Sequence, residues 1–261
     1  MKEETQIGLN RTGIQMSPFD ASELQKAVES AAPEPPGDGS ALAKLRESYI
    51  VNSDPIGSVP IPGTLKGAVK TVTAKLTGDR PEVLLDKLGE RLAFERTGTR
   101  LYDALIAKLD AAQTGTPSMT RDDLLKIRNE EVRHFSILSD AVQSLGGDPT
   151  AQTPCADVAG VESIGLVQVV TDPRTTIAQS LHAILVAEMT DNNGWDQLIA
   201  LAEDNGQNAM VTDFDAARNE ERTHLQSVQR WLDEATLGIA MPAAPAAQQQ
   251  PAGAGQPPTV H

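Results

Sequence analysis

The sequence predicts an all-α protein built around one bundle of four long helices. The chain of 261 residues is 39% hydrophobic, which is enough for one sizeable core. Aromatic residues make up only 3% of it, which disfavours a β-sandwich. Between residues 81 and 237, apolar side chains recur in steps of three and four, the period of a helix with one buried face.

The first two long helices are predicted to form an antiparallel pair. One begins at Pro81, a residue suited to a first helical turn, and continues through residue 110. After about nine residues, Ser118 or Thr120 can cap a second helix, which the glycine pair at 146–147 ends. A connection this short places the two helices side by side.

A second antiparallel pair is predicted after a long connection. Residues 148–172 are interrupted by two prolines and two glycines, so we expect no long helix there, only a crossover that spans the bundle. Asp172-Pro173 is expected to open the third helix. Asn205-Gly206 predicts a tight turn into the fourth helix, which ends at Leu237-Gly238.

Both ends of the chain are predicted to lie outside the bundle. Residues 1–80 carry several proline and glycine clusters, with at most short helices at 21–31 and 40–49, and indicate an irregular extension. Residues 238–261 are mostly Pro, Ala, Gln and Gly, a composition typical of a disordered tail. The bundle itself is predicted to occupy residues 81–237.

Charge and cysteine content narrow the classes of partner. The chain has 22 basic and 36 acidic residues, and the resulting net charge of −14 disfavours nucleic acid and anionic membranes. No stretch approaches the roughly 20 apolar residues of a membrane span, and Met1–Gly13 lacks the apolar segment of a signal peptide, so a cytoplasmic protein is expected. Cys155 is the only cysteine, which excludes an intrachain disulfide and a cysteine-based iron–sulfur site.

The strongest functional signal is a motif that occurs twice. Residues 128–134 read RNEEVRH and residues 218–224 read RNEERTH, with five of seven positions identical. Each copy contains Glu-x-x-His, which places a carboxylate and an imidazole on one face of a helix. A further glutamate precedes each motif glutamate, Glu95 by 36 residues and Glu188 by 33. Each helical pair therefore offers one lone Glu and one Glu-x-x-His.

Six residues are expected to bind metal because of this pattern. They are Glu95, Glu131, His134, Glu188, Glu221 and His224. Each glutamate falls on the apolar stripe of its helix, where an unpaired carboxylate is costly to bury. Four carboxylates and two neutral imidazoles carry a charge of about −4, which two divalent ions neutralise, and mixed oxygen and nitrogen donors suit iron or manganese and also accept zinc.

The order of these residues resembles the ferritin-like di-iron carboxylate family of ferritins, bacterioferritins and rubrerythrins. The resemblance covers about residues 81–237 and all six positions. It implies a four-helix bundle with one long crossover and two iron ions, or two of manganese, bridged by Glu131 and Glu221 and capped by Glu95 and Glu188. It further implies a homo-oligomer with oxidase, peroxidase or ferroxidase activity toward O2 or H2O2. Iron storage, a dimanganese catalase and a non-catalytic metal-binding or scaffold bundle remain alternatives.

Residues beside the six predicted ligands are candidates for supporting roles. Tyr102 resembles the near-site tyrosine of many ferritins and is the predicted catalytic residue, as an electron relay, with core packing as the alternative. Glu130 and Glu220 are each expected to reach the histidine of the opposite helix, because metal-bound histidines usually donate their second N–H to a carboxylate or carbonyl. Asp191 is a candidate extra carboxylate, although its counterpart in the repeat is Gly98.

Overall fold

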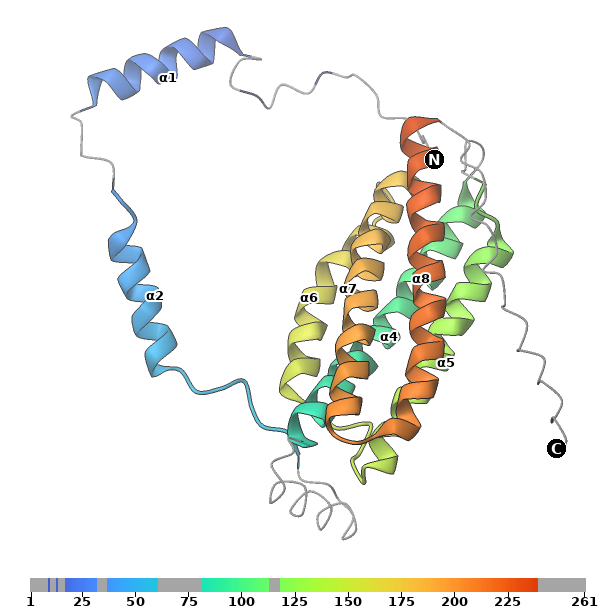
Figure 1. Ribbon diagram of the computed structural model, residues 1–261. Coiled ribbons are helices and arrows are strands. Elements are labelled where there is room, and N and C mark those ends of the chain that lie inside the picture. Colours follow the sequence, from blue (N-terminus) through green and yellow to red (C-terminus); the bar gives the residue numbers. More distant parts are fainter. Residues whose placement is uncertain are drawn as a thin grey trace, which may run out of the picture.

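The computed structural model of the chain is all-helical throughout its described part, which confirms the predicted fold class (Figure 1). The structure describes residues 9, 13, 17–31, 37–60, 81–112 and 118–238. None of the helices in these ranges is long and apolar enough to span a bilayer. The predicted C-terminal tail lies outside the described residues, apart from Gly238.

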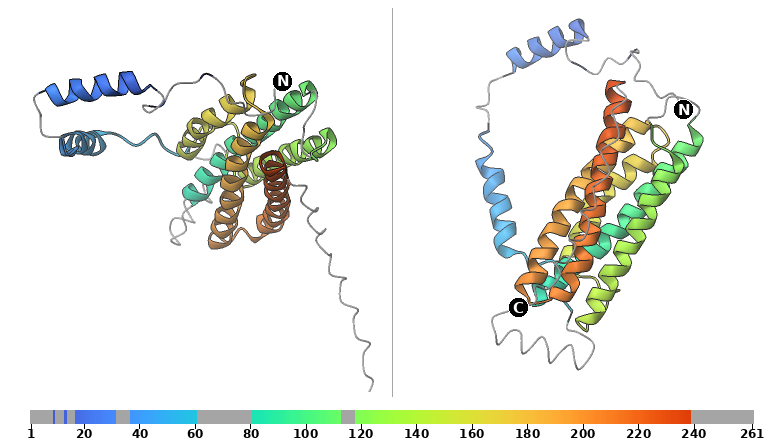
Figure 2. Two further views of the ribbon diagram at one scale, coloured as in Figure 1. Left: turned by 90° about the horizontal axis from the view of Figure 1, so that it is seen from above. Right: turned by 45° about the vertical axis from the view of Figure 1, so that its right-hand side comes forward.

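Four long helices form the bundle: α4 (Pro81–Ala111), α5 (Arg121–Ser144), α7 (Ile177–Asp204) and α8 (Asn208–Leu237). Helix α4 packs against α5, and α7 packs against α8. The two pairs meet where α4 contacts α7 and where α5 contacts α8. Within each pair the helices run antiparallel (Figures 1 and 2). The two predicted helical hairpins are therefore both present.

Local sequence signals set the ends of three of these helices. Thr120 caps α5 in a capping box with Asp123, as the sequence predicts for this position. Gly206 adopts a φ of 67° in the turn between α7 and α8, and Gly238 ends α8 with a φ of 64°. Both glycines occupy the left-handed region that other residues avoid, which explains why the helices stop there.

The crossover contains a helix that the sequence analysis did not predict. Helix α6 (Pro154–Thr171) lies along α4 and α7. Thr153 caps it by accepting a backbone N–H at 3.3 Å, and its proline occupies the first turn, where proline is tolerated. Gly160 and Gly165 face open space and each costs about 1 kcal/mol relative to alanine. Packing of the opposite face against α4 offsets that cost, so the expectation of a broken crossover was wrong.

The third long helix begins later than the predicted Asp172-Pro173. Asp172 instead caps the end of α6. Helix α7 starts at Ile177, because Thr176 and Gln179 form a capping box immediately before and within its first turn. Lys108 of α4 holds the turn between α6 and α7. Its ammonium donates to the backbone carbonyls of Asp172 and Thr175 in that turn, at 2.9 and 3.1 Å.

The bundle core consists of two apolar clusters separated by a polar layer. One cluster includes Leu105 and Trp231, and the other includes Leu88 and Phe214. The first cluster takes its residues mainly from the C-terminal halves of α4 and α8, and the second takes them from the N-terminal halves of the same helices. The two clusters therefore lie toward opposite ends of the bundle. Between them every long helix contributes buried polar side chains. The apolar clusters therefore shield this layer from solvent on both sides.

Two short helices precede the bundle and contact no other described helix. They are α1 (Pro18–Ser30) and α2 (Ser40–Asn52), close to the two short helices that the sequence predicts. Neither contains a buried residue, and both stand apart from the bundle (Figures 1 and 2). The division of the chain into an extension, a bundle and a tail stays a prediction.

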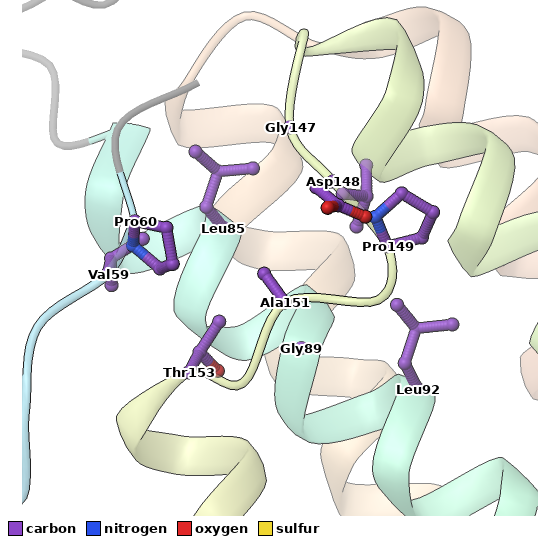
Figure 3. A pocket seen from close by; sticks show the side chains of 11 residues that line it. Val59, Pro60, Leu85, Gly89, Leu92, Gly147, Asp148, Pro149, Ala151 and Thr153 are labelled. Carbon is purple, nitrogen blue, oxygen red and sulfur yellow. The ribbon is translucent and has the colours of Figure 1, made fainter. Parts of the chain in front are cut away.

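The segment after α2 returns to the bundle near the start of α4. Val59 and Pro60 line a pocket there together with Leu85 and Gly89 of α4 (Figure 3). The loop between α5 and α6 closes the other side of the pocket, which Thr153 borders. Val59 and Pro60 therefore lie against one end of the bundle.

Candidate metal centre

The polar layer brings the six predicted ligands together from four helices. They are Glu95 on α4, Glu131 and His134 on α5, Glu188 on α7, and Glu221 and His224 on α8, none of them more than 3% exposed. The ring centroids of the two histidines are 6.0 Å apart. The antiparallel arrangement explains this meeting, because it places the middle of every helix at the same level of the bundle.

The donor atoms fall into three overlapping groups, two of which contain a histidine. The first half-site comprises Glu95, His134 and Glu221, and the second half-site comprises Glu131, Glu188, Glu221 and His224. Within each group, one ligand atom from every residue lies within 4.8 Å of all the others. Glu221 belongs to both half-sites. Glu131 also joins Glu95, Asp191 and Glu221 in a third group of the same kind, which places it between the two half-sites.

Several donor atoms in this layer are buried without a hydrogen-bond partner. They are Oε2 of Glu95, Nδ1 of His134, Oε2 of Glu188 and Oε1 of Glu221. The His134 Nδ1 atom lies 2.6 Å from Glu221 Oε1 and 3.7 Å from Glu95 Oε2, yet neither contact has the geometry of a hydrogen bond. Buried polar atoms normally have hydrogen-bond partners. The atoms of Glu95, His134 and Glu221, which lie together in the first half-site, are therefore well suited to hold a cation.

Glu130 and Glu220 hold the outer nitrogens of the two histidines. The Nε2 atom of His224 lies 2.9 Å from Glu130 Oε2, and that of His134 lies 2.8 Å from Glu220 Oε2. Both contacts join α5 to α8, so the predicted cross-helix pairing is confirmed. Burial lowers the pKa of His134, but the Glu221 and Glu95 carboxylates raise it to about 11, so without metal both of its ring nitrogens carry a proton. The carboxylate at Nε2 favours the N–H on that atom, so an ion that displaces the Nδ1 proton would meet a lone pair directed toward the half-site.

Tyr102 lies beside the second half-site. Its hydroxyl donates to Oε1 of Glu188, and the residue is 1% exposed. Burial and the charge of Glu188 raise the pKa of Tyr102 well above its usual range, so the phenol is a neutral donor. Its counterpart in the repeat, Trp195, is fully buried and meets the His134 ring edge-on at a centroid distance of 5.6 Å.

Burial and mutual repulsion set the protonation of the carboxyl groups. Burial, followed by the charge of Glu221, raises the pKa of Glu131 well above its usual range and that of Glu188 to about 8. Burial also favours the neutral form of Glu221, but the nearby His224 and His134 lower its pKa to about 2. The Glu221 carboxylate, which is common to both half-sites, is therefore held ionised.

Arg91 is the charged residue of this layer that the sequence analysis missed. Its side chain is 2% exposed, donates to Glu95 Oε1 at 2.8 Å and forms an ion pair with Asp191. The guanidinium also lies over the ring of Phe94, 4.7 Å from its centroid. The one sequence signal for it is its position four residues before Glu95, on the same helix face. Asp191 does lie in the polar layer, next to this cation.

Two glycines make room for these charged groups. A Cβ atom at Gly98 would lie 2.3 Å from Oε2 of Glu131. A Cβ atom at Gly194 would lie 2.5 Å from Nη1 of Arg91. Any other residue at either position would therefore displace a side chain of the layer.

Comparison with known proteins gives no match. The chain resembles no protein-family model, no curated protein and no solved structure closely enough to be matched to it. The structure is an all-helical bundle with a buried cluster of carboxylates and histidines that can hold a metal ion, and it is compatible with a ferritin-like fold.

Proposed function

We propose that this protein is a ferritin-like dinuclear metal protein, with iron as its metal, that reacts with O2 or H2O2. The observation that carries the proposal is the pair of half-sites sharing Glu221, in which buried donor atoms of Glu95, His134 and Glu188 have no hydrogen-bond partner. Donors of this kind, oxygen with one nitrogen per half-site, suit iron or manganese.

Each predicted ligand has a place in this proposal. Glu95 and His134 would hold one ion, Glu188 and His224 would hold the other, and Glu131 and Glu221 would be shared. Two ferrous ions bound there would supply the electrons that reduce O2 or H2O2. Manganese would fit the same donors, as a dimanganese catalase requires.

The surrounding residues would support that chemistry. The two apolar clusters keep bulk water from the layer, while Glu130 and Glu220 fix the histidine rings. Tyr102 is the proposed catalytic residue, because its hydroxyl contacts Glu188 and offers a path for a proton or an electron. The space that borders Tyr102 and Glu131 is about 10 Å³, no more than one water molecule needs, which leaves no room for an organic substrate.

The test is elemental analysis of the purified protein beside the variant Glu131→Ala/His224→Ala, followed by aerobic addition of Fe(II) with optical monitoring. We expect about two irons per chain, absent from the variant, and rapid oxidation. Tyr102→Phe should retain the iron and slow its oxidation. A chain that binds no stoichiometric metal would contradict the proposal.

A non-catalytic metal-binding or scaffold protein is the second candidate. It is favoured by α1 and α2, which expose large side chains such as Phe19 (87%) and Tyr49 (63%) and pack on no described helix. Deleting residues 1–80 and measuring the mass by light scattering would separate docking elements from spacers. The same measurement on the full chain tests the predicted homo-oligomer. Iron storage, which needs a cage of many subunits, would give a far larger mass.

A further inference from the structure

We infer that Arg91 makes the two half-sites unequal, so that the second half-site takes up a metal ion before the first. This inference rests on the proposed dinuclear centre. Arg91 acts as a positioning residue, since it does not itself bind the ion. Its guanidinium competes with an incoming cation for Glu95, the glutamate of the first half-site that lies outside the Glu-x-x-His motifs.

The internal repeat shows where the two halves of the layer differ. When Glu95 is aligned with Glu188, three pairs of equivalent positions around the layer hold side chains that differ in charge or in size. These pairs are Arg91 and Ile184, Gly98 and Asp191, and Leu101 and Gly194. Two of these differences accommodate the guanidinium. Asp191 pairs with it, and Gly194 leaves the space that it fills.

The two lone glutamates consequently have different partners. Oε1 of Glu95 accepts from the Arg91 cation at 2.8 Å, whereas Oε1 of Glu188 accepts from the neutral hydroxyl of Tyr102. A fixed positive charge occupies one lone pair of Glu95 and also repels a second cation nearby. This difference weakens the first half-site.

The guanidinium is held where it competes. Arg91 is 2% exposed, and its carbon Cζ lies 4.7 Å from the ring centroid of Phe94 and 6.0 Å from that of Trp195. A charge this deeply buried is stabilised only by its partners, so it does not swing into solvent when an ion arrives. The ion must instead share Glu95 with it.

Titration of the metal-free full chain with Co²⁺ under anaerobic conditions tests the inference. Calorimetry gives the affinity of each step, and visible absorption reports the ligands of the bound ion. We expect two steps whose Kd values differ by at least about tenfold, the lower end of the effect of a group that contacts a ligand. His134→Ala should keep the tighter step, and His224→Ala should lose it.

Substitution of Arg91 separates its charge from its volume. Arg91→Met should tighten the weaker step and bring the two Kd values within about threefold. Arg91→Lys keeps the cation and should keep the two steps apart. Gly194→Ala gives a second route, because the added methyl displaces the guanidinium and should act like Arg91→Met. Gly165→Ala is its matched control, because that position faces open space on α6.

The outcomes distinguish this inference from the proposed function. A wild-type chain that binds no Co²⁺ overturns the dinuclear centre itself. Two equal steps in the wild type, or unequal steps that neither Arg91→Met nor Gly194→Ala brings together, overturn only the role of Arg91. Loss of the tighter step in His134→Ala would show that the order of filling is reversed, which also overturns the inference.

Discussion

Bound metal should stabilise this protein strongly, because the metal-free layer contains buried donor atoms without partners. Four such atoms belong to Glu95, His134, Glu188 and Glu221. Leaving one buried polar atom unsatisfied costs about 1–3 kcal/mol. His134 Nδ1 and Glu221 Oε1 lie 2.6 Å apart and partly satisfy each other, so the two atoms on Glu95 and Glu188 carry the main cost, about 2–6 kcal/mol together. Ions that coordinate these atoms relieve that cost in the folded state only, which adds to the free energy of unfolding.

The expected change in melting temperature follows from that free energy. In a domain of this size, 1 kcal/mol shifts Tm by about 2–4 °C, so relief of about 4 kcal/mol raises Tm by about 8–16 °C. Differential scanning calorimetry would compare the chain in EDTA with the chain in excess Zn²⁺, which fits the donor set and does not change oxidation state.

A variant lacking the ligands provides the control. Glu131→Ala/His224→Ala should melt at the same temperature with EDTA and with Zn²⁺. Val161→Ala, on the exposed face of α6, should show the full wild-type shift. A wild-type shift below about 2 °C, or an equal shift in the double variant, would refute the assignment of the unpartnered atoms as ligands.

Three further predictions concern the carboxylates that contact the histidines, the lysine that holds the turn between α6 and α7, and the cysteine of α6. Glu130→Gln and Glu220→Gln should each weaken Zn²⁺ binding about 10- to 100-fold in competition with a chromophoric chelator, and unchanged affinity in both would contradict the role given to these carboxylates. Lys108→Met should lower the free energy of unfolding in urea by about 1–3 kcal/mol, because two carbonyls lose their donor, and an unchanged midpoint would count against that contact. Burial and Asp86 raise the pKa of Cys155 from 9.0 to about 12. Near about pH 8, below both values, the reactive thiolate is therefore about a thousandfold rarer in the folded protein than in guanidinium chloride, and alkylation should be slower by the same factor. Equal rates would contradict the shift.

Much of the candidate site could be predicted from the sequence because its signals repeat. The two Glu-x-x-His motifs each fix a pair of side chains on one helix face, and Glu130 and Glu220 occupy the same place in both copies. Their contacts with the opposite histidines follow once α5 and α8 lie side by side. The caps at Thr120 and Gly238 are likewise local, since each depends on a few neighbouring residues.

The sequence by itself thus determined the four long helices, most of their ends and the level at which the six acidic and histidine residues meet. Tertiary structure alone decided the existence of α6, since packing against α4 offsets the cost of two glycines. It also decided the partnership of Arg91 with Asp191, residues 100 positions apart on different helices. Helical periodicity and capping act over a few residues, whereas a buried ion pair depends on which helices become neighbours and on the space that Gly194 leaves between them.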